Sequence, residues 1–243
     1  ALSTTDGLPA GIRTRSLATA LAHDHDDDAE AVALRLGRLA RIESQAFTAL
    51  NTAFLRDGAV VEVASGVVVD TPIHLLFVTR SGVEPVLSQP RVLVVAGANS
   101  QVRVVESHAG DGETPYLSNT VTEVSAGDHA LIDHYTLVRE ADAAFRVGSL
   151  HVTLGRASNF SSHIITLGGA IVRNEARVVL AGEGSECALN GLYLANGRQL
   201  VDNQTTIDHA QPHCDSHELY KGILGGRSRA VFNGKIIVRP ARD

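Results

Sequence analysis

The chain has 243 residues, of which 44% are hydrophobic and only 4% aromatic, so its core should consist of Val, Leu, Ile and Ala in narrow, regular layers. The formal net charge of −6 and the lack of a basic cluster argue against nucleic acid as a partner, and no apolar run approaches the roughly 18 residues that span a bilayer, which argues against membrane insertion. Two cysteines, Cys187 and Cys214, are too few for a disulfide framework, and a cytoplasmic location is predicted.

Residues 1–56 are predicted to form an N-terminal arm followed by short helices. Residues 1–22 are rich in Ala, Thr and Gly and lack firm periodicity, so a loose arm or short helical turns are expected there. Between residues 26 and 54, apolar residues recur at intervals of three and four, which predicts two short amphipathic helices.

Residues 57–243 are predicted to form a core built almost entirely of β-strands. Short β-branched runs such as Val60–Val63, Ile73–Val78 and Val92–Val95 are separated by Gly, Ser, Asp and Pro. The turn glycines recur in two series with a period of 27 or 28 residues, offset by about half a period: Gly127, Gly155 and Gly182, and then Gly169, Gly197 and Gly225. Recurrence at this length indicates a repeated coil.

Two columns of residues follow the first glycine series in register, with Gly97 counted as its earliest member. Three residues after each glycine stand small residues, and two places further on stand apolar residues: Ser100, Ala130, Ser158 and Ser185, and then Val102, Ile132, Phe160 and Cys187. Such columns are typical of a β-solenoid, in which each coil buries its inner face against its neighbours. A sandwich or jelly roll with coincidentally spaced turns remains open, whereas hexapeptide repeats are disfavoured.

The segment from residue 209 to residue 217 contains three imidazoles and a thiol, namely His209, His213, Cys214 and His217. These donor types suggest a metal site. Pro212 disfavours a continuous helix, and alternating apolar residues flank the segment, so a turn between strands is predicted. Two interpretations stay open: a solvated polar turn, and a partial ligand set that is completed by residues elsewhere or by another chain.

The remaining titratable residues are not expected to form a site. Cys187 is expected to be a small buried filler, and Cys214 is the better candidate for transient contact with iron or sulfur because imidazoles lie nearby. The other histidines are expected at the surface or as satisfied strand residues: His74, His108, His151 and His163. His129 and His134 are five residues apart and should face opposite sides of a strand.

A β-helix enzyme that acts on polysaccharides is a competing hypothesis. Such an enzyme needs paired acids on one face of successive coils. Glu106, Asp133 and Glu175 fall on different strands without an evident stack, which argues against it. A purely structural interaction module is the third hypothesis.

Several motifs resemble the SufB/SufD family, and within it the SufD branch. They occur in the family's order from about residue 45 to the end: Ala49–Phe54, Asp57-Gly58, Pro72–Leu75, Asn190–Tyr193, Asp208–Ser216, Leu219–Gly222 and Ala230–Lys235. The resemblance implies a mainly β fold with a right-handed parallel β-helix, preceded by a short α-helical N-terminal region.

The resemblance also implies a function. The chain is expected to be a non-catalytic scaffold subunit of the SUF machinery for iron–sulfur cluster assembly, with a SufB-like subunit and a SufC-like ATPase as partners. No stably bound cofactor is expected, but a transient iron–sulfur cluster could form at the partner interface, with His209, His213, Cys214 and His217 as candidate contacts.

Family members continue past Arg239-Pro240 into more strands and a C-terminal helical segment, which docks the ATPase. This chain ends at Asp243, and we expect it to be truncated. The strand Lys235, Ile236, Ile237 and Val238 would then be an open solenoid edge, so it is the predicted interface, and a homodimer through such strands is predicted as well.

Overall fold

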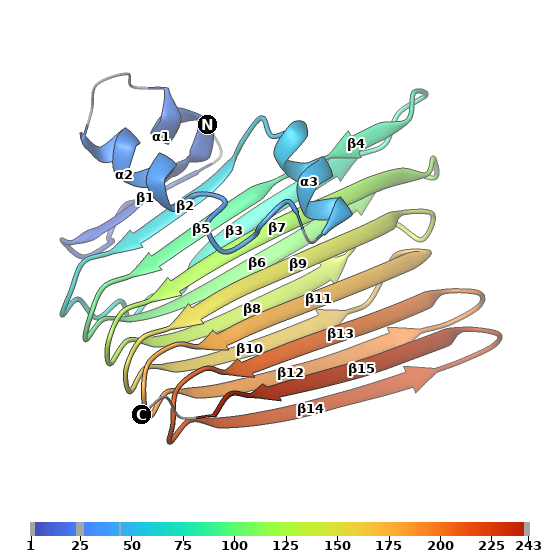
Figure 1. Ribbon diagram of the computed structural model, residues 1–243. Helices are drawn as coiled ribbons and strands as arrows, with labels where there is room; N and C mark the ends of the chain where they lie inside the picture. The colour runs from blue at the N-terminus through green and yellow to red at the C-terminus, as the bar shows by residue number, and fades with distance from the viewer. Residues whose placement is uncertain (1–2, 23–26, 44, 241–243) are drawn as a thin grey trace.

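The structure, a computed structural model, describes residues 3–22, 27–43 and 45–240 (Figure 1). Strands make up 56% of the chain and helices 8%, which confirms the mainly β prediction. The helices are α1 (Leu17–Leu21), α2 (Asp27–Arg35) and α3 (Ala46–Ala53). The strands are β1 (Ile12–Ser16), β2 (Gly58–Val63), β3 (Ile73–Arg80), β4 (Val86–Ser88), β5 (Arg91–Ala96), β6 (Gln101–Asp111), β7 (Tyr116–Ala126), β8 (Leu131–Arg139), β9 (Phe145–Leu154), β10 (Asn159–Thr166), β11 (Ile171–Leu180), β12 (Glu186–Ala195), β13 (Leu200–His209), β14 (Asp215–Leu224) and β15 (Arg229–Val238).

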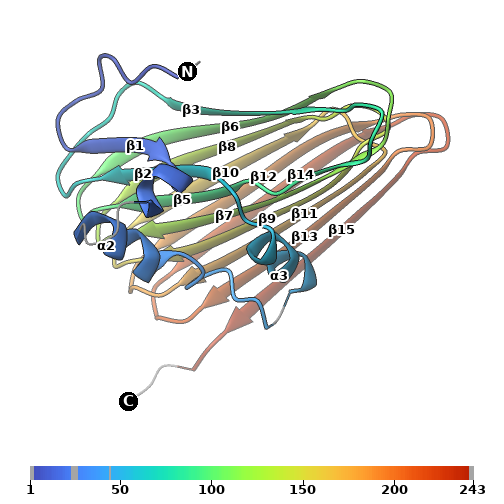
Figure 2. The ribbon, with the colours of Figure 1, turned by 90° about the horizontal axis from the view of Figure 1, so that it is seen from above.

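The strands form two sheets that face each other across a lumen (Figure 2). Sheet A has the order β1-β2-β5-β7-β9-β11-β13-β15, with β4 also paired to β7, and sheet B has the order β14-β12-β10-β8-β6-β3. From β5 onward the chain alternates between the sheets, so each coil supplies one strand to each. Among the described strands, every pairing is parallel except that of β1 with β2. This arrangement is a parallel β-solenoid, and it excludes the sandwich and jelly-roll alternatives.

The register confirms the predicted apolar column. Val102 pairs with Ile132, Ile132 with Phe160, and Phe160 with Cys187, and all four side chains are buried in the main core cluster. Stacking one coil on the next removes these side chains from water on both sides. The column therefore supplies hydrophobic stabilisation along the whole length of the solenoid.

Both glycine series mark the turns between sheets. The turns from sheet A to sheet B each contain a residue with positive φ at the same place, so a left-handed backbone stacks from coil to coil: Asn99 (56°), His129 (60°), Ala157 (50°), Gly184 (69°) and His213 (59°). The Ser100, Ser158 and Ser185 hydroxyls donate to the carbonyl oxygen three residues earlier at 2.7 to 2.9 Å. The small-residue column is thus confirmed as part of a repeated turn.

The N-terminal region contains the two predicted helices, α2 and α3, which lie on the sheet A side (Figure 2). Of the two alternatives predicted for residues 1–22, a loose arm or short helical turns, the five-residue α1 fits the second, but neither included β1, which pairs antiparallel with β2. Tertiary pairing with the edge of sheet A, which no local periodicity reveals, orders this segment. None of the described helices is long and apolar enough to cross a membrane.

Helix α3 is attached to the outer face of sheet A through the fully buried side chain of Asn51. Its amide nitrogen donates to the carbonyl oxygens of Pro90 (3.1 Å) and Asn119 (2.9 Å), and its oxygen accepts from Arg91 (3.2 Å). The Asn119 amide in turn donates to the carbonyl oxygen of Phe47 on α3 at 2.8 Å. Directional hydrogen bonds therefore fix the position of this short helix.

The chain just after α2 is held to the same face by Glu123 on β7. The Glu123 carboxylate accepts from the backbone N–H groups of Gly37, Leu39 and Ala40 at 2.8 to 3.0 Å, and it forms an ion pair with Arg91 at 2.6 Å. Burial alone would raise the pKa of Glu123, but the charge of Arg91 and the N–H donors outweigh it and lower the pKa.

Candidate functional site

The segment 209–217 forms the last described turn from sheet A to sheet B, as predicted. His209 ends β13, and its Nε2 lies 2.9 Å from the Ser216 hydroxyl. His213 occupies the left-handed position of the turn, with φ of 59°. It is thus the counterpart of His129 and Asn99 in earlier turns. The repeated turn geometry therefore explains the position of His213 without a metal site.

Cys214 belongs to the small-residue column and follows Ser185 in it. Its thiol lies 3.4 Å from the Ser185 hydroxyl and donates to the Gly182 carbonyl oxygen at 3.4 Å, where the serines of earlier turns also bond a turn carbonyl. The side chain is partly buried. The column thus gives Cys214 a structural role, with part of its surface still accessible.

The four donors of this segment do not converge within the chain. His213 lies 3.8 Å from Glu183 and His217 lies 3.3 Å from Asp215, and both imidazoles are 79% exposed. Among residues 3–22, 27–43 and 45–240, no group of three or more His, Cys, Asp or Glu side chains could hold a metal ion. Contact with iron or sulfur at these residues remains a prediction that needs donors from another chain.

The predicted interface residues Lys235, Ile236, Ile237 and Val238 lie on β15, the last strand of sheet A. One edge of β15 pairs with β13, and no described strand pairs with its other edge. Ile236 and Val238 are 56% and 74% exposed. The position fits a pairing edge, and its use as an interface remains a prediction.

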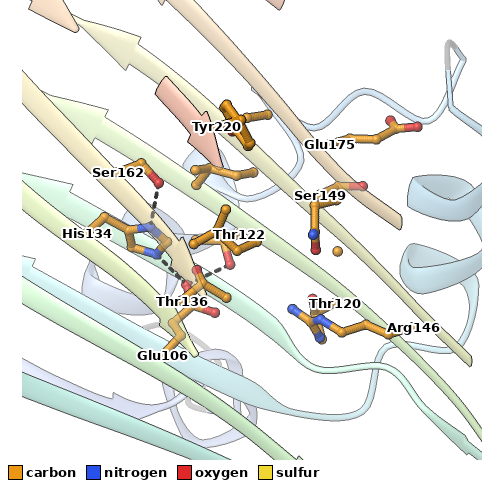
Figure 3. A pocket seen from close by; sticks show the side chains of 15 residues that line it. Glu106, Thr120, Thr122, His134, Thr136, Arg146, Ser149, Ser162, Glu175 and Tyr220 are labelled. Atoms are coloured by element: carbon orange, nitrogen blue, oxygen red, sulfur yellow. Dashed lines mark hydrogen bonds and ion pairs between the residues drawn. The ribbon is translucent and has the colours of Figure 1, made fainter. Parts of the chain in front are cut away.

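The lumen contains a polar cluster around Glu106 on β6. The Glu106 carboxylate lies 2.8 Å from His134 Nε2, and it accepts a hydrogen bond from Thr122 at 2.8 Å (Figure 3). It also lies 3.2 Å from His108 Nε2. All three titratable side chains are 2% exposed or less. The two imidazoles connect β6 and β8 of sheet B through the Glu106 carboxylate, and the Thr122 hydroxyl on β7 connects the same carboxylate to sheet A.

Burial and hydrogen bonding act in opposite directions on this cluster. Burial alone would raise the pKa of Glu106, but the hydrogen bonds and charges of His108 and His134 outweigh it and hold the pKa far below its ordinary value. Burial and the positive charge of Arg146 lower the pKa of His108, against the opposing effect of Glu106. The cluster therefore keeps an ionised carboxylate inside the solenoid.

A second buried group joins Arg146, Glu140 and Tyr116. Arg146 Nη1 lies 3.7 Å from a Glu140 oxygen, and the Tyr116 hydroxyl donates to the other Glu140 oxygen at 2.6 Å. The Nε and Nη1 atoms of Arg146 form no hydrogen bond with the described residues. A Cβ added at Gly148 would lie 2.9 Å from Arg146 Nη2, so the glycine makes room for the guanidinium.

Glu106, His134 and Arg146 from these two groups border a small cavity between the sheets (Figure 3). Its volume is about 40 Å³, which suffices for roughly two or three water molecules. The lining combines charged, amide and hydroxyl groups with a few apolar side chains, and includes Glu106, Thr120, His134, Arg146, Asn174 and Tyr220. The Ser162 hydroxyl lies 3.5 Å from His134 Nδ1, on the side of the imidazole opposite Glu106, and the arrangement can solvate a few polar groups in the interior (Figure 3).

His108 and His151 do not lie at the surface, and the predicted alternative of a satisfied strand residue holds for His108 only at Nε2, which lies 3.2 Å from Glu106. Both are buried, and His108 Nδ1 and His151 Nε2 form no hydrogen bond with the described residues. Burial, against the opposing charge of Glu123, lowers the pKa of His151 to about 4. His108 lies on the inner face of sheet B, whereas His151 lies on the outer face of sheet A in register with Glu123, which holds the chain after α2. Neither kind of burial is visible in the alternation of a single strand.

Glu106 and His134 were overlooked as a pair, although a signal existed. They are 28 residues apart, one period of the glycine series, and Glu106 pairs with Thr136 while Val104 pairs with His134. The two side chains are therefore diagonal neighbours on the inner face of sheet B. The 28-residue period, combined with the alternation of inward and outward side chains along each strand, would have predicted that Glu106 and His134 are neighbours.

Two family models match the chain. The SUF system FeS cluster assembly SufBD core domain matches residues 77–242, and the SufBD protein N-terminal region matches residues 2–75. The chain belongs to the SufBD family. Its predicted resemblance to SufB/SufD is therefore confirmed.

Several curated SufBD relatives are similar to this chain. An iron–sulfur cluster assembly SufBD family protein of Synechocystis sp. is 31% identical, with 99% of this chain and 54% of that protein covered. A SufBD family protein of Mycobacterium leprae is 30% identical, with coverage of 82% and 50%, and the iron–sulfur cluster assembly protein SufD of Escherichia coli is 24% identical, with coverage of 81% and 47%. The chain spans about half the length of these SufBD relatives.

Proposed function

We propose that this SufBD chain is part of a non-catalytic scaffold subunit of the SUF iron–sulfur cluster assembly machinery. The observation that carries the proposal is the match to both SufBD family models, over residues 2–75 and 77–242. The similarity to a protein named SufD in Escherichia coli favours the SufD branch.

The architecture supports a scaffold. Parallel pairing from β2 to β15 and the buried apolar column produce a stiff body whose exposed faces can hold partners in fixed positions. The acids that a polysaccharide-cleaving enzyme would need lie on three different surfaces: Glu106 in the lumen, Asp133 on the outer face of sheet B and Glu175 on the outer face of sheet A. No observation favours that second function.

The proposed partners are a SufB-like subunit and a SufC-like ATPase. The strand edge of β15 at Lys235–Val238 would meet the SufB-like subunit, and the ATPase would bind through family segments outside this chain. A transient cluster would assemble at the subunit interface, where His209, His213, Cys214 and His217 could add donors to those of the partner.

The test is co-expression of the full-length protein with the SufB-like and SufC-like proteins of the same genome. We expect a stoichiometric complex in size-exclusion chromatography with light scattering. Ile237→Asp on β15 should weaken the complex, whereas Val179→Asp, a matched change on the outer face of β11, should leave it intact. Separate elution of the full-length protein in the presence of both partners would overturn the proposal.

The cluster contacts need their own measurement. After anaerobic reconstitution of the complex with iron and sulfide, Cys214→Ala is expected to lower the visible absorbance of the cluster relative to Cys187→Ala. Equal absorbance in the two variants would restrict Cys214 to its role in the turn.

A further inference from the structure

Part of the outer face of sheet B, toward the turns to sheet A, is aliphatic, whereas the outer face of sheet A carries a network of polar side chains. On sheet A, Arg173 bonds Glu175 and Asp202, and Gln204 bonds Asp202 and Asn233. On sheet B, aliphatic side chains from successive coils lie side by side. We call this set the aliphatic stripe: Leu137, Ile165, Leu167, Leu192, Leu194 and Ile223.

The register makes the stripe continuous. Leu137 pairs with Ile165 and Ile165 with Leu192, while Leu194 pairs with Ile223 on the next strand. Leu167, Leu192, Leu194 and Ile223 are 39 to 64% exposed, although leucine and isoleucine are among the most often buried residues. A groove of about 810 Å³ runs beside the stripe, lined by Leu167, Leu194, Ile223 and Leu224 together with the turns from sheet B to sheet A. An extended apolar patch of this kind marks a protein interaction site.

Basic side chains border the stripe. Arg139 stands at the end of β8, Lys221 pairs in register with Leu192, and Arg198 lines the groove. None of the three forms an ion pair or side-chain hydrogen bond within residues 3–22, 27–43 and 45–240. Asp142 is the single acid among the groove residues. The rim is therefore positively charged and complements an acidic partner.

We propose that the aliphatic stripe docks an amphipathic α-helix of a partner protein, with leucine-like anchors on one face and acidic residues beside them. Strands in a sheet are about 4.8 Å apart and a helix rises about 5.4 Å per turn, so a helix along the solenoid axis presents about one turn to each coil. Covering the four strands from β8 to β14 takes about ten residues, with anchors at positions i, i+3 or i+4, and i+7.

Other occupants fit this face less well. A partner strand needs a free strand edge, whereas β8, β10 and β12 are paired on both sides. A second copy of this chain packed face to face would place the basic rims near each other, which like-charge repulsion opposes. Helix α3 already shows that a short helix can lie on an outer sheet face of this solenoid.

The test uses the full chain and a labelled synthetic helical peptide of about 14 residues, with leucines at the anchor positions and glutamates beside them. Fluorescence anisotropy should show saturable binding. A control peptide with lysines in place of the glutamates should bind at least about tenfold more weakly. Because no SUF partner takes part, failure here leaves the proposed scaffold role untouched, and the reverse also holds.

Variants locate the site. Leu192→Glu, at the centre of the stripe, should weaken acidic-peptide binding at least about tenfold, and Leu194→Glu serves if the first variant does not fold. The matched control Thr206→Glu, on the outer face of sheet A, should bind like the parent chain. Arg139→Glu combined with Lys221→Glu should reverse the preference toward the lysine peptide.

Three outcomes would overturn the proposal. They are absence of saturable binding, equal binding of the two peptides, and binding that Leu192→Glu leaves unchanged. A dimer in light scattering that Leu192→Glu dissociates would assign the stripe to a second copy of the chain, and it would overturn the proposed helix as well.

Discussion

The two halves of the lumen differ in chemistry although the same strands supply both. Near the turns from sheet A to sheet B the interior is apolar, with Val102, Ile132, Phe160 and Cys187 facing Val124 and Val152. Toward the other turns it holds Glu106, Arg146 and Asn174, with several polar atoms that lack hydrogen bonds to the described residues. The apolar half provides stability, and the polar half carries a desolvation cost that is only partly compensated.

The largest effect is expected from breaking the apolar half. Phe160→Ala removes a fully buried ring and should lower the free energy of unfolding by about 4 kcal/mol, because it leaves a cavity that stacked coils cannot close. Urea unfolding followed by circular dichroism measures the loss. Phe145→Ala, at a ring that is 43% exposed, is the matched control and should cost less than about 1 kcal/mol. Equal losses would show that Phe160 is not a core anchor.

Arg146→Met tests whether the polar half opposes stability. The substitution leaves Glu140 buried without its cation and should cost about 3 kcal/mol. Adding Glu140→Gln should recover at least about 1 kcal/mol, since no unpaired buried charge then remains. Urea unfolding of the two single variants and the double variant gives the coupling. Strict additivity of the two changes would contradict a coupled pair.

Glu106→Gln tests the anionic centre. The change keeps the shape but removes the charge that His108 and His134 contact, and it should cost about 2 kcal/mol near pH 7. Because the folded-state pKa lies below the ordinary value of 4.5, the stabilisation is fully present well above pH 4.5 and is lost as the pH falls below it.

Unfolding of the parent chain and of the Glu106→Gln variant should therefore differ most at about pH 7 and less at about pH 4, and the difference should keep shrinking as the pH falls further toward the lowered folded-state pKa of Glu106. The exposed residue Glu113 supplies the control Glu113→Gln, which should match the parent chain at both pH values. A difference between the parent chain and Glu106→Gln that persists unchanged at low pH would mean that the charge of Glu106 is not its source.

The smallest effect on stability is expected at the thiols. Cys214→Ser places in the column the residue type that earlier turns carry, and it should change the free energy of unfolding by less than about 0.5 kcal/mol.

The two thiols, Cys187 and Cys214, should still differ in reactivity. Burial and the charge of Glu218 raise the pKa of Cys187 to about 12, so iodoacetamide should label Cys214 in the native protein and Cys187 only after unfolding. Mass spectrometry reads out the labels, and native labelling of Cys187 would contradict its burial.

The solenoid could be predicted because its signals repeat. Each coil places a glycine, a small residue and an apolar residue at the same offsets, as Gly127, Ala130 and Ile132 do in one coil. The pattern is weak in any one coil, but its recurrence in successive coils makes it significant. The two helices followed from their own periodicity. By contrast, β1 depends on a distant strand edge, and no local pattern in residues 12–16 reveals it.

The candidate site was predicted less completely. The histidine-rich turn was placed correctly, but its donors point apart because the turn geometry, repeated from earlier coils, fixes His213 and Cys214. The buried cluster at Glu106 was overlooked because a polar residue at an alternating position is ordinarily exposed. Only the pairing of successive coils shows that these polar positions face inward.

The first strands of the two sheets have unequal protection against aggregation. Sheet A begins with β1, a five-residue strand with Arg13 and Arg15, and short, charged edges discourage a further strand from joining. Sheet B begins with the eight-residue β3, in which Leu76 and Val78 are 59% and 62% exposed and whose outer edge no described strand pairs. Of these two first strands, β3 is therefore the more prone to unwanted pairing with another chain, and a lysine at Leu76 should reduce that pairing.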